Sequence, residues 1–260
     1  GGMGRSGGTG LIEDCTVTGN TGADGGGLYL TGGNQRVNET RVSGNFSIGS
    51  VRGGGGIFIQ ASTVLVENTT ISGNTATQRF GGGIMKLSGN LTVVNSTLSG
   101  NTTNLDGGGI YNQSANAQII NSTIRGNTAN DDGGGVARSN GTVSLRNALI
   151  VGNSASDLGD EIFGAVTANG NNLFGHSGRT NAQAFDGFTP GASDITATSD
   201  GTNPTAEASI LDTALADNGG PTLTHALVMG SPAQEAGDNA LATDDGTATV
   251  LDLDPWTQGD

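Results

Sequence analysis

Aspartates that precede a repeated Gly-Gly-Gly block are the residues best suited to bind a metal ion. Asp106, Asp131 and Asp132 stand before two successive blocks, so a stacked fold would bring their carboxylates together. Carboxylate and carbonyl oxygens are the ligands that Ca²⁺ prefers. We predict a candidate Ca²⁺ site at Asp106, Asp131 and Asp132 and no other cofactor. The alternative is that these aspartates only form turns.

Residues that could cleave a polysaccharide are scattered through the chain. A lyase acting on uronates needs a basic residue as base and charge neutraliser, and Lys86 and Arg138 share one position after the Gly block, two units apart. An inverting hydrolase needs carboxylates that converge from neighbouring units, but Arg79 and Phe80 interrupt the aspartate position. We therefore predict a solvated face for the basic pair, no catalytic residue and no enzymatic activity. A polysaccharide lyase or hydrolase remains the alternative.

The histidines and the single cysteine show no spacing typical of catalysis or metal binding. His176 and His225 lie outside the repeats, without metal-ligand spacing. Cys15 stands at a position that holds Thr, Ser or Ala in the other units, which indicates a buried small residue rather than a nucleophile.

These residues belong to a repeated unit that predicts one coil of a solenoid. Gly-Gly-Gly blocks end at Gly27, Gly56, Gly83, Gly109 and Gly135, so the steps are 29, 27, 26 and 26 residues. The Gly-Asn pair that closes each unit keeps a similar period. Units of this length stack because none can bury its apolar face alone.

Three apolar columns indicate the fold class. They are the residue after each Gly block and the third and eighth residues before each closing Asn; in the coil closed by Asn127 they are Ile110, Ile124 and Ile119. Short β-branched runs broken by Gly, Asn and Ser predict strands rather than helices. We predict an all-β, right-handed parallel β-helix with three short strands per coil of about 26 residues and about 4.8 Å between coils.

One column, six residues before each closing Asn, is polar. Its members are Asp14, Glu39, Asn68, Asn95, Asn121 and Asn147. Stacked amides can donate and accept hydrogen bonds along the axis, so we predict a structural ladder through Asn68, Asn95, Asn121 and Asn147. The Gly blocks predict corners where positive φ and close approach of the coils exclude a Cβ.

Two further columns are expected to face outward. Tyr29, Phe58, Met85 and Tyr111 would form an apolar stripe that contacts a partner or a carbohydrate, unless the C-terminal segment covers it. The second column could order water as an ice-binding face, although Arg41 interrupts it. Its threonines are Thr16, Thr70, Thr97 and Thr123.

Composition limits the classes of partner. The formal net charge of −14 disfavours nucleic acid and anionic membranes, both of which need clustered Lys and Arg. With 48 Gly and only ten aromatic residues (seven Phe, two Tyr and one Trp), the chain suits a thin, elongated core. One Cys gives no disulfide framework, and no apolar run is long enough to span a membrane.

The repeats divide the chain into two parts. Residues 1–175 are predicted to form the β-helix, with Phe163 and Phe174 closing the stack. Residues 176–260 lose the period and are predicted to form an irregular, β-rich segment that caps or continues it. The opening Gly-rich stretch resembles a corner of a preceding coil, so we expect a longer precursor.

The repeats resemble a known group of surface proteins. VENTTISGNTA, NSTLSGNTT and NSTIRGNTA are similar to the polymorphic outer-membrane-protein-like repeats of bacterial surface β-helix proteins. LADNGGPTLTHALVMGSPAQEAGDNA resembles the segment that follows the β-helix in the choice-of-anchor group of those proteins. The resemblance implies an exported, extracellular or cell-surface protein with an adhesive or structural role and no catalytic residues to transfer.

We therefore expect a non-enzymatic surface β-helix. It would serve as an adhesin or as the subunit of a fibre or matrix assembled through open coil ends, where strand edges can pair. The expected partners are a second copy of the chain, forming an oligomer or filament, or a cell-surface carbohydrate. Ca²⁺-stabilised adhesion and ice binding remain further alternatives.

Overall fold

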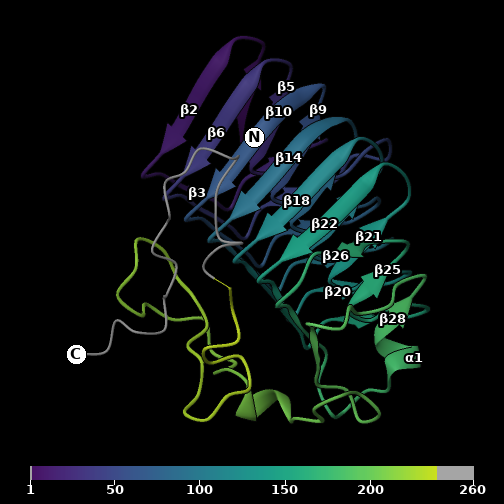
Figure 1. The fold of residues 1–260 in the computed structure, drawn as a ribbon. Helices are drawn as coiled ribbons and strands as arrows, with labels where there is room; N and C mark the ends of the chain where they lie inside the picture. The colour runs from purple at the N-terminus through teal and green to yellow at the C-terminus, as the bar shows by residue number, and fades with distance from the viewer. Residues whose placement is uncertain (1, 239–260) are drawn as a thin grey trace.

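The fold is a rod of stacked coils built from parallel strands (Figure 1). The computed structural model describes residues 2–238, so residues 239–260 of the predicted capping segment lie outside the described residues. The strands form four parallel sheets, A to D, and each coil passes through A, B, C and D in turn. The all-β parallel solenoid predicted from the sequence is confirmed.

Sheets A and B make two sides of each coil. Sheet A contains β1 (Met3–Ser6), β5 (Leu28–Thr31), β9 (Ile57–Gln60), β13 (Ile84–Lys86), β17 (Ile110–Asn112), β21 (Val136–Arg138), β25 (Ile162–Phe163) and β28 (Phe185–Asp186). Sheet B contains β2 (Thr9–Glu13), β6 (Asn34–Asn38), β10 (Ser62–Glu67), β14 (Gly89–Val94), β18 (Asn116–Ile120), β22 (Thr142–Arg146) and β26 (Thr167–Ala168).

Sheets C and D complete the coil. Sheet C contains β3 (Thr16–Thr18), β7 (Arg41–Ser43), β11 (Thr70–Ser72), β15 (Thr97–Ser99), β19 (Thr123–Arg125), β23 (Leu149–Val151), β27 (Leu173–Phe174) and β29 (Ile195–Thr196). Sheet D contains β4 (Thr21–Gly22), β8 (Phe46–Ser47), β12 (Thr75–Ala76), β16 (Thr102–Thr103), β20 (Thr128–Ala129) and β24 (Ser154–Ala155). The prediction of three strands per coil missed sheet D, because its two-residue strands turn small or polar side chains inward and leave no apolar column.

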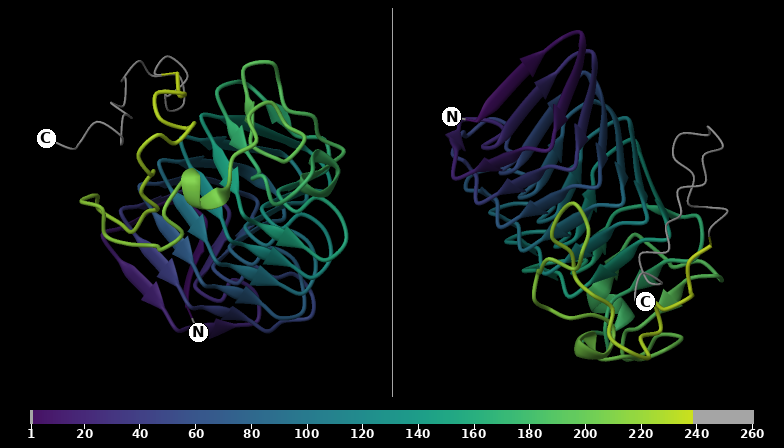
Figure 2. Two further views of the ribbon diagram at one scale, coloured as in Figure 1. Left: turned by 90° about the horizontal axis from the view of Figure 1, so that it is seen from below. Right: turned by 90° about the vertical axis from the view of Figure 1, so that its left-hand side faces the viewer.

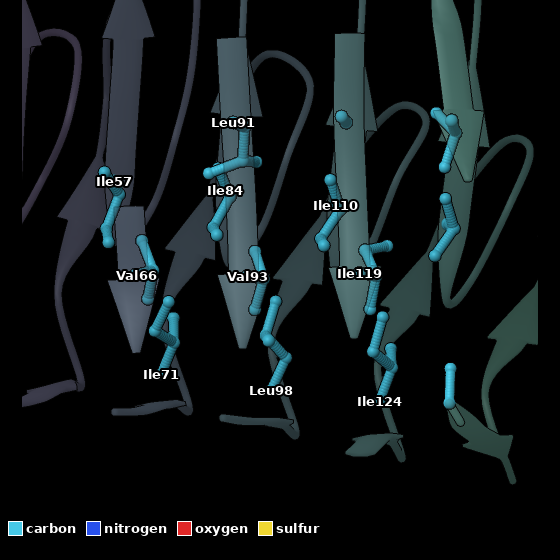
Figure 3. Close-up of a cluster of buried hydrophobic side chains, with 14 of the residues drawn as sticks. Ile57, Val66, Ile71, Ile84, Leu91, Val93, Leu98, Ile110, Ile119 and Ile124 are labelled. Carbon is cyan, nitrogen blue, oxygen red and sulfur yellow. The ribbon is translucent and has the colours of Figure 1, made fainter. Parts of the chain in front are cut away.

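The three predicted apolar columns fill the interior (Figure 3). In one coil Ile110 of sheet A, Ile119 of sheet B and Ile124 of sheet C are all 0 % exposed. Each meets its counterpart in the next coil through the parallel register, for example Ile110 beside Val136. The core is thus a stack of thin apolar layers, and its repetition fixes the register of every coil.

Glycine forms the corner between sheets D and A, as predicted. The Gly that begins this corner has φ between 61° and 77° in all five blocks, from Gly25 to Gly133, and in Gly159, where the block is otherwise lost; L-residues avoid this region. The next two glycines lie against the following coil. A Cβ on Gly108 would stand 2.4 Å from the Gly134 carbonyl oxygen, so the coils can approach only where the side chain is absent.

Strand pairing continues beyond the predicted boundary at residue 175. β28 pairs with β25 in sheet A, and β29 pairs with β27 in sheet C. These last strands pair through main-chain hydrogen bonds, and their side chains do not repeat the residue types of the earlier coils. The period therefore disappears from the sequence although the strand pairing continues. Between them, helix α1 (Asn181–Ala184) and the ring cluster of Phe174, Phe185 and Phe188 close the interior. Phe163 instead packs outside sheet A.

Candidate functional site

A ladder of asparagine side chains runs along the rod, but through a different column from the one predicted. In the closing Gly-Asn pairs from Asn20 to Asn127, the Nδ2 donates to the Asn Oδ1 of the next coil at 2.9–3.1 Å, and the main-chain N donates to the same oxygen. The members are Asn20, Asn45, Asn74, Asn101, Asn127 and Asn153. From Asn45 onward they are at most 2 % exposed, so the ladder pairs buried polar groups within the core.

The predicted ladder of Asn68, Asn95, Asn121 and Asn147 is wrong. These residues form the bend between sheets B and C and have φ of 46–48°, the left-handed conformation that Asn tolerates better than most residues. Across the described residues 2–238, no hydrogen bond joins their side chains to one another; Asn147 Nδ2 instead donates to the carbonyl of Asp238. Backbone geometry, not amide pairing, selects Asn here.

Glu161 ends the true ladder. It stands in GDEIF, where the last Gly of the block would be, and is 0 % exposed. Its carboxylate accepts hydrogen bonds from Asn153 Nδ2 at 2.6 Å and from the main-chain N of Gly152 at 2.9 Å and of Asn153 at 3.3 Å. Glu161 therefore replaces the amide of the next coil. The loss of the Gly block at this point was the sequence signal that could have revealed it.

Titration of Glu161 should be visible in the stability of the protein. Burial raises its pKa from 4.5 to about 8, outweighing the three hydrogen bonds that favour the ionised form. Because the folded pKa lies above the unfolded one, the contribution of Glu161 to stability is complete below pH 4.5 and is lost as pH rises through about 8. We expect Glu161→Gln to abolish the fall in the free energy of unfolding between about pH 6 and 8. Urea titrations across this range would measure it, and an unchanged slope would contradict the assignment.

The predicted apolar stripe is not an exposed contact surface. Phe58 is 0 %, Met85 1 % and Tyr111 6 % exposed, and Tyr29 is half-buried. Phe80 stacks on Tyr111 with ring centroids 4.3 Å apart, and Arg52 lies over the Phe58 ring at 5.6 Å. Loops that precede the Gly corners thus cover the column, so the stripe is a second apolar cluster outside sheet A.

Both basic side chains of the candidate lyase pair make hydrogen bonds within the chain. Lys86 is 0 % exposed inside the rod, where Nζ donates to Asn112 Oδ1 at 2.8 Å and to the carbonyl of Ser114. Burial lowers its pKa to about 8. Arg138 donates from Nε to the carbonyl of Gly141 at 2.8 Å. The solvated face predicted for Lys86 is wrong, because β13 turns alternate residues inward and Lys86 follows the inward Ile84 by two.

The three aspartates of the candidate Ca²⁺ site do come together. Carboxylate oxygens of Asp106, Asp131 and Asp132 lie within 4.8 Å of one another on the loops before the Gly corners. Burial, reinforced by the charges of Asp131 and Asp132, raises the pKa of Asp106 to about 6. The donor set suits Ca²⁺, which would need further oxygens from carbonyls or water. Ion binding itself stays a prediction.

Replacing Asp106 by Asn tests whether this cluster is under electrostatic strain. The pKa of the Asp106 carboxyl is about 6 in the folded protein and 3.8 in the unfolded chain. The contribution of Asp106 to the free energy of unfolding is therefore complete below pH 3.8 and is lost as pH rises through 6. We expect Asp106→Asn to raise the free energy of unfolding at neutral pH by about 1 kcal/mol in chelator, after allowing for solvent screening. If the cluster holds Ca²⁺, the order reverses in millimolar Ca²⁺. Equal stabilities in both buffers would contradict both expectations.

The candidate ice-binding column on sheet C is covered in its middle, while Thr16 is exposed and Thr123 is half-buried. Thr70 is 0 % and Thr97 4 % exposed, because the chain folds back over them. Thr70 Oγ1 donates to the carbonyl of Leu223 at 2.6 Å. Sequence reasoning also treated His225 as an ordinary loop residue. It is 2 % exposed, and its Nε2 lies 2.9 Å from Ser99 Oγ of β15.

Comparison with known proteins agrees with this geometry. The family described as "Right handed beta helix region" matches residues 2–182, more than two thirds of the 260 residues. The chain belongs to the right-handed β-helix family. The predicted handedness is thereby confirmed. Searches of curated proteins and of solved structures gave no match.

The right-handed β-helix family includes both enzymes and proteins without catalytic activity, so membership fixes the fold alone. Within residues 2–238 no helix is long and apolar enough to cross a membrane.

Proposed function

We propose that this right-handed β-helix is a non-enzymatic rod with an adhesive or structural role, at a cell surface or in an extracellular matrix. The observation that carries the proposal is the internal use of its reactive side chains. Lys86 fastens one coil to the next, Glu161 terminates the asparagine ladder, and His225 holds the returning chain. Groups that an enzyme would present to a substrate serve here to build a stiff rod.

The outer face of sheet B is the surface proposed for contact. In one of its columns every member is exposed and carries an uncharged amide or hydroxyl, in register from coil to coil. Its members are Thr9, Asn34, Thr63, Asn90, Asn116 and Thr142. Such a row repeats the same hydrogen-bonding groups about every 4.8 Å along the axis. This pattern suits a polar, uncharged partner such as a surface carbohydrate.

Electron microscopy and carbohydrate binding together test the proposal. We expect rods or filaments, with and without Ca²⁺, and binding to a neutral polysaccharide that Asn90→Glu and Asn116→Glu weaken without changing stability. The matched control is Gln113→Glu, an exposed change outside sheet B. Release of unsaturated uronides, lost in Arg138→Ala, would replace the proposal with a polysaccharide lyase. Binding that is insensitive to the sheet B variants would move the contact to another face.

A further inference from the structure

The segment after the last coil folds back along the rod as a C-terminal arm, residues 207–231. Figure 2 shows it in yellow-green along one side of the coils. It begins with a short 3-10 helix, η1 (Glu207–Ser209), and two isolated antiparallel bridges, Leu211 with Leu227 and Ala216 with Thr224, join its two limbs. The arm lies on the outer face of sheet C and runs along the rod.

Two kinds of contact hold the arm. Near the C-terminal end of the rod, Ile210 and Leu211 pack with Val151 and other apolar side chains of sheet C. Farther along, the contacts are polar: Thr222 Oγ1 donates to the Asn68 carbonyl at 3.1 Å, in addition to the bond between Thr70 and Leu223. No main-chain strand pairing links the arm to sheet C within the described chain. The polar half therefore depends on a few side-chain bonds.

His225 is the residue where the rod and both limbs of the arm meet. Its Nδ1 lies 2.9 Å from the carbonyl oxygen of Asp212 on the first limb, and its Nε2 lies 2.9 Å from Ser99 Oγ on the rod. A carbonyl can only accept, so Nδ1 carries the proton in the neutral ring and Nε2 accepts from the Ser99 hydroxyl. Protonation of Nε2 would reverse that bond and turn the Ser99 hydrogen away.

Burial and the charge of Arg125 oppose a second proton on His225. Arg125 of β19 lies under the same arm and is already paired with Glu207, whose Oε1 is 2.7 Å from its Nε; Arg125 also donates to the Thr213 carbonyl at 2.9 Å. The hydrogen bond to the Asp212 carbonyl favours the protonated ring and is the largest effect that opposes burial; the negative charge of Asp212 acts in the same direction, more weakly than Arg125 acts against it. Burial first, and then Arg125, lower the pKa of His225 below 6.5.

We propose that the C-terminal arm is a detachable cover over the outer face of sheet C and that His225 is the latch that acidification opens. The sign follows from the lowered pKa: the latch stabilises the closed arm above the ordinary histidine pKa and loses that contribution as pH falls below it. Opening would uncover the hydroxyls of Thr70 and Ser99 and the apolar Val151, a new surface available only in acid. The coils themselves would stay intact, because their main-chain ladders do not involve the arm.

Hydrogen exchange followed by mass spectrometry, on the whole chain, tests the latch. After correction for intrinsic rates, peptides covering residues 207–231 should lose protection between about pH 7.5 and about pH 5.5, on either side of the ordinary histidine pKa, while β11 and β15 stay protected. His225→Gln should remove the pH dependence, whereas the matched variant His176→Gln, at the half-buried loop histidine outside the arm, should keep it.

Three outcomes would overturn the latch: an arm equally protected at both pH values, a pH dependence that persists in His225→Gln, or loss of protection in arm and coils together. A second variant tests the same contact if His225→Gln folds poorly. Ser99→Ala, which removes only a hydroxyl, should leave the arm poorly protected even at neutral pH. An arm protected as in the wild type in Ser99→Ala would also refute the latch.

Discussion

Asn101→Ala is expected to lower the free energy of unfolding by about 3–5 kcal/mol, because it leaves several buried groups without partners. Asn101 is 0 % exposed. Its Oδ1 accepts from the main-chain N and the Nδ2 of Asn74, and its own Nδ2 donates to the Ile71 carbonyl and to Asn127 Oδ1. Alanine removes all of these bonds from the middle of the ladder.

The matched control is Asn95, which lies in the same coil at the bend before sheet C. Asn95 has φ of 48°, so Asn95→Gly should be nearly neutral and Asn95→Ala should cost about 1 kcal/mol through backbone strain. Urea titration monitored by circular dichroism would compare the variants, and hydrogen exchange would show whether the loss stays near the altered coil. A large loss of stability in Asn95→Gly, or a small loss in Asn101→Ala, would contradict the ladder through Asn101 and favour the predicted one through Asn95.

The error between the two asparagine columns shows what the repeat period could and could not predict. The repeat period and the apolar spacing predicted the coil, the core columns and the Gly corner, because every unit buries residues at the same positions. Choosing the ladder needed the backbone angle at each bend. One signal was available: the closing position is Asn in all six coils, whereas the predicted column begins with Asp14 and Glu39. A ladder that pairs amide with amide requires Asn without exception, but a left-handed bend does not.

Contacts between distant segments could not be predicted from the period. The predicted stripe through Phe58 and Tyr111 was assigned to solvent by alternation alone, which cannot show that Phe80 on a neighbouring loop covers it. His225 meets Ser99 across 126 residues, and neither lies in a recognisable motif. The three aspartates were placed correctly because they stand on equivalent loops, directly before the Gly blocks of two adjacent coils. Stacking predicts neighbours along the axis, while loops and the arm decide which faces stay open.

Gly108→Ala is expected to cost at least about 4 kcal/mol, or to prevent folding, because close coil stacking leaves no room for one methyl group. The new Cβ would lie 2.4 Å from the Gly134 carbonyl oxygen and 2.7 Å from main-chain atoms of Thr128. Both neighbours are backbone held in parallel ladders, so neither can move without parting two coils. The damage should spread along the rod, since each coil is stabilised mainly by its two neighbours.

Gly100→Ala in the same coil separates this steric effect from backbone preference. Gly100 has φ of 63°, and a Cβ there would meet nothing within 4 Å, so alanine should cost only about 1–2 kcal/mol of strain. Soluble yield and the urea midpoint of the two variants, measured side by side, give the comparison. Near-wild-type stability of Gly108→Ala would mean that the coils can separate locally. Glycine would then be required in these blocks only where the backbone has positive φ. A deficit much larger than that of Gly100→Ala would make inter-coil distance the reason that glycine recurs at this corner.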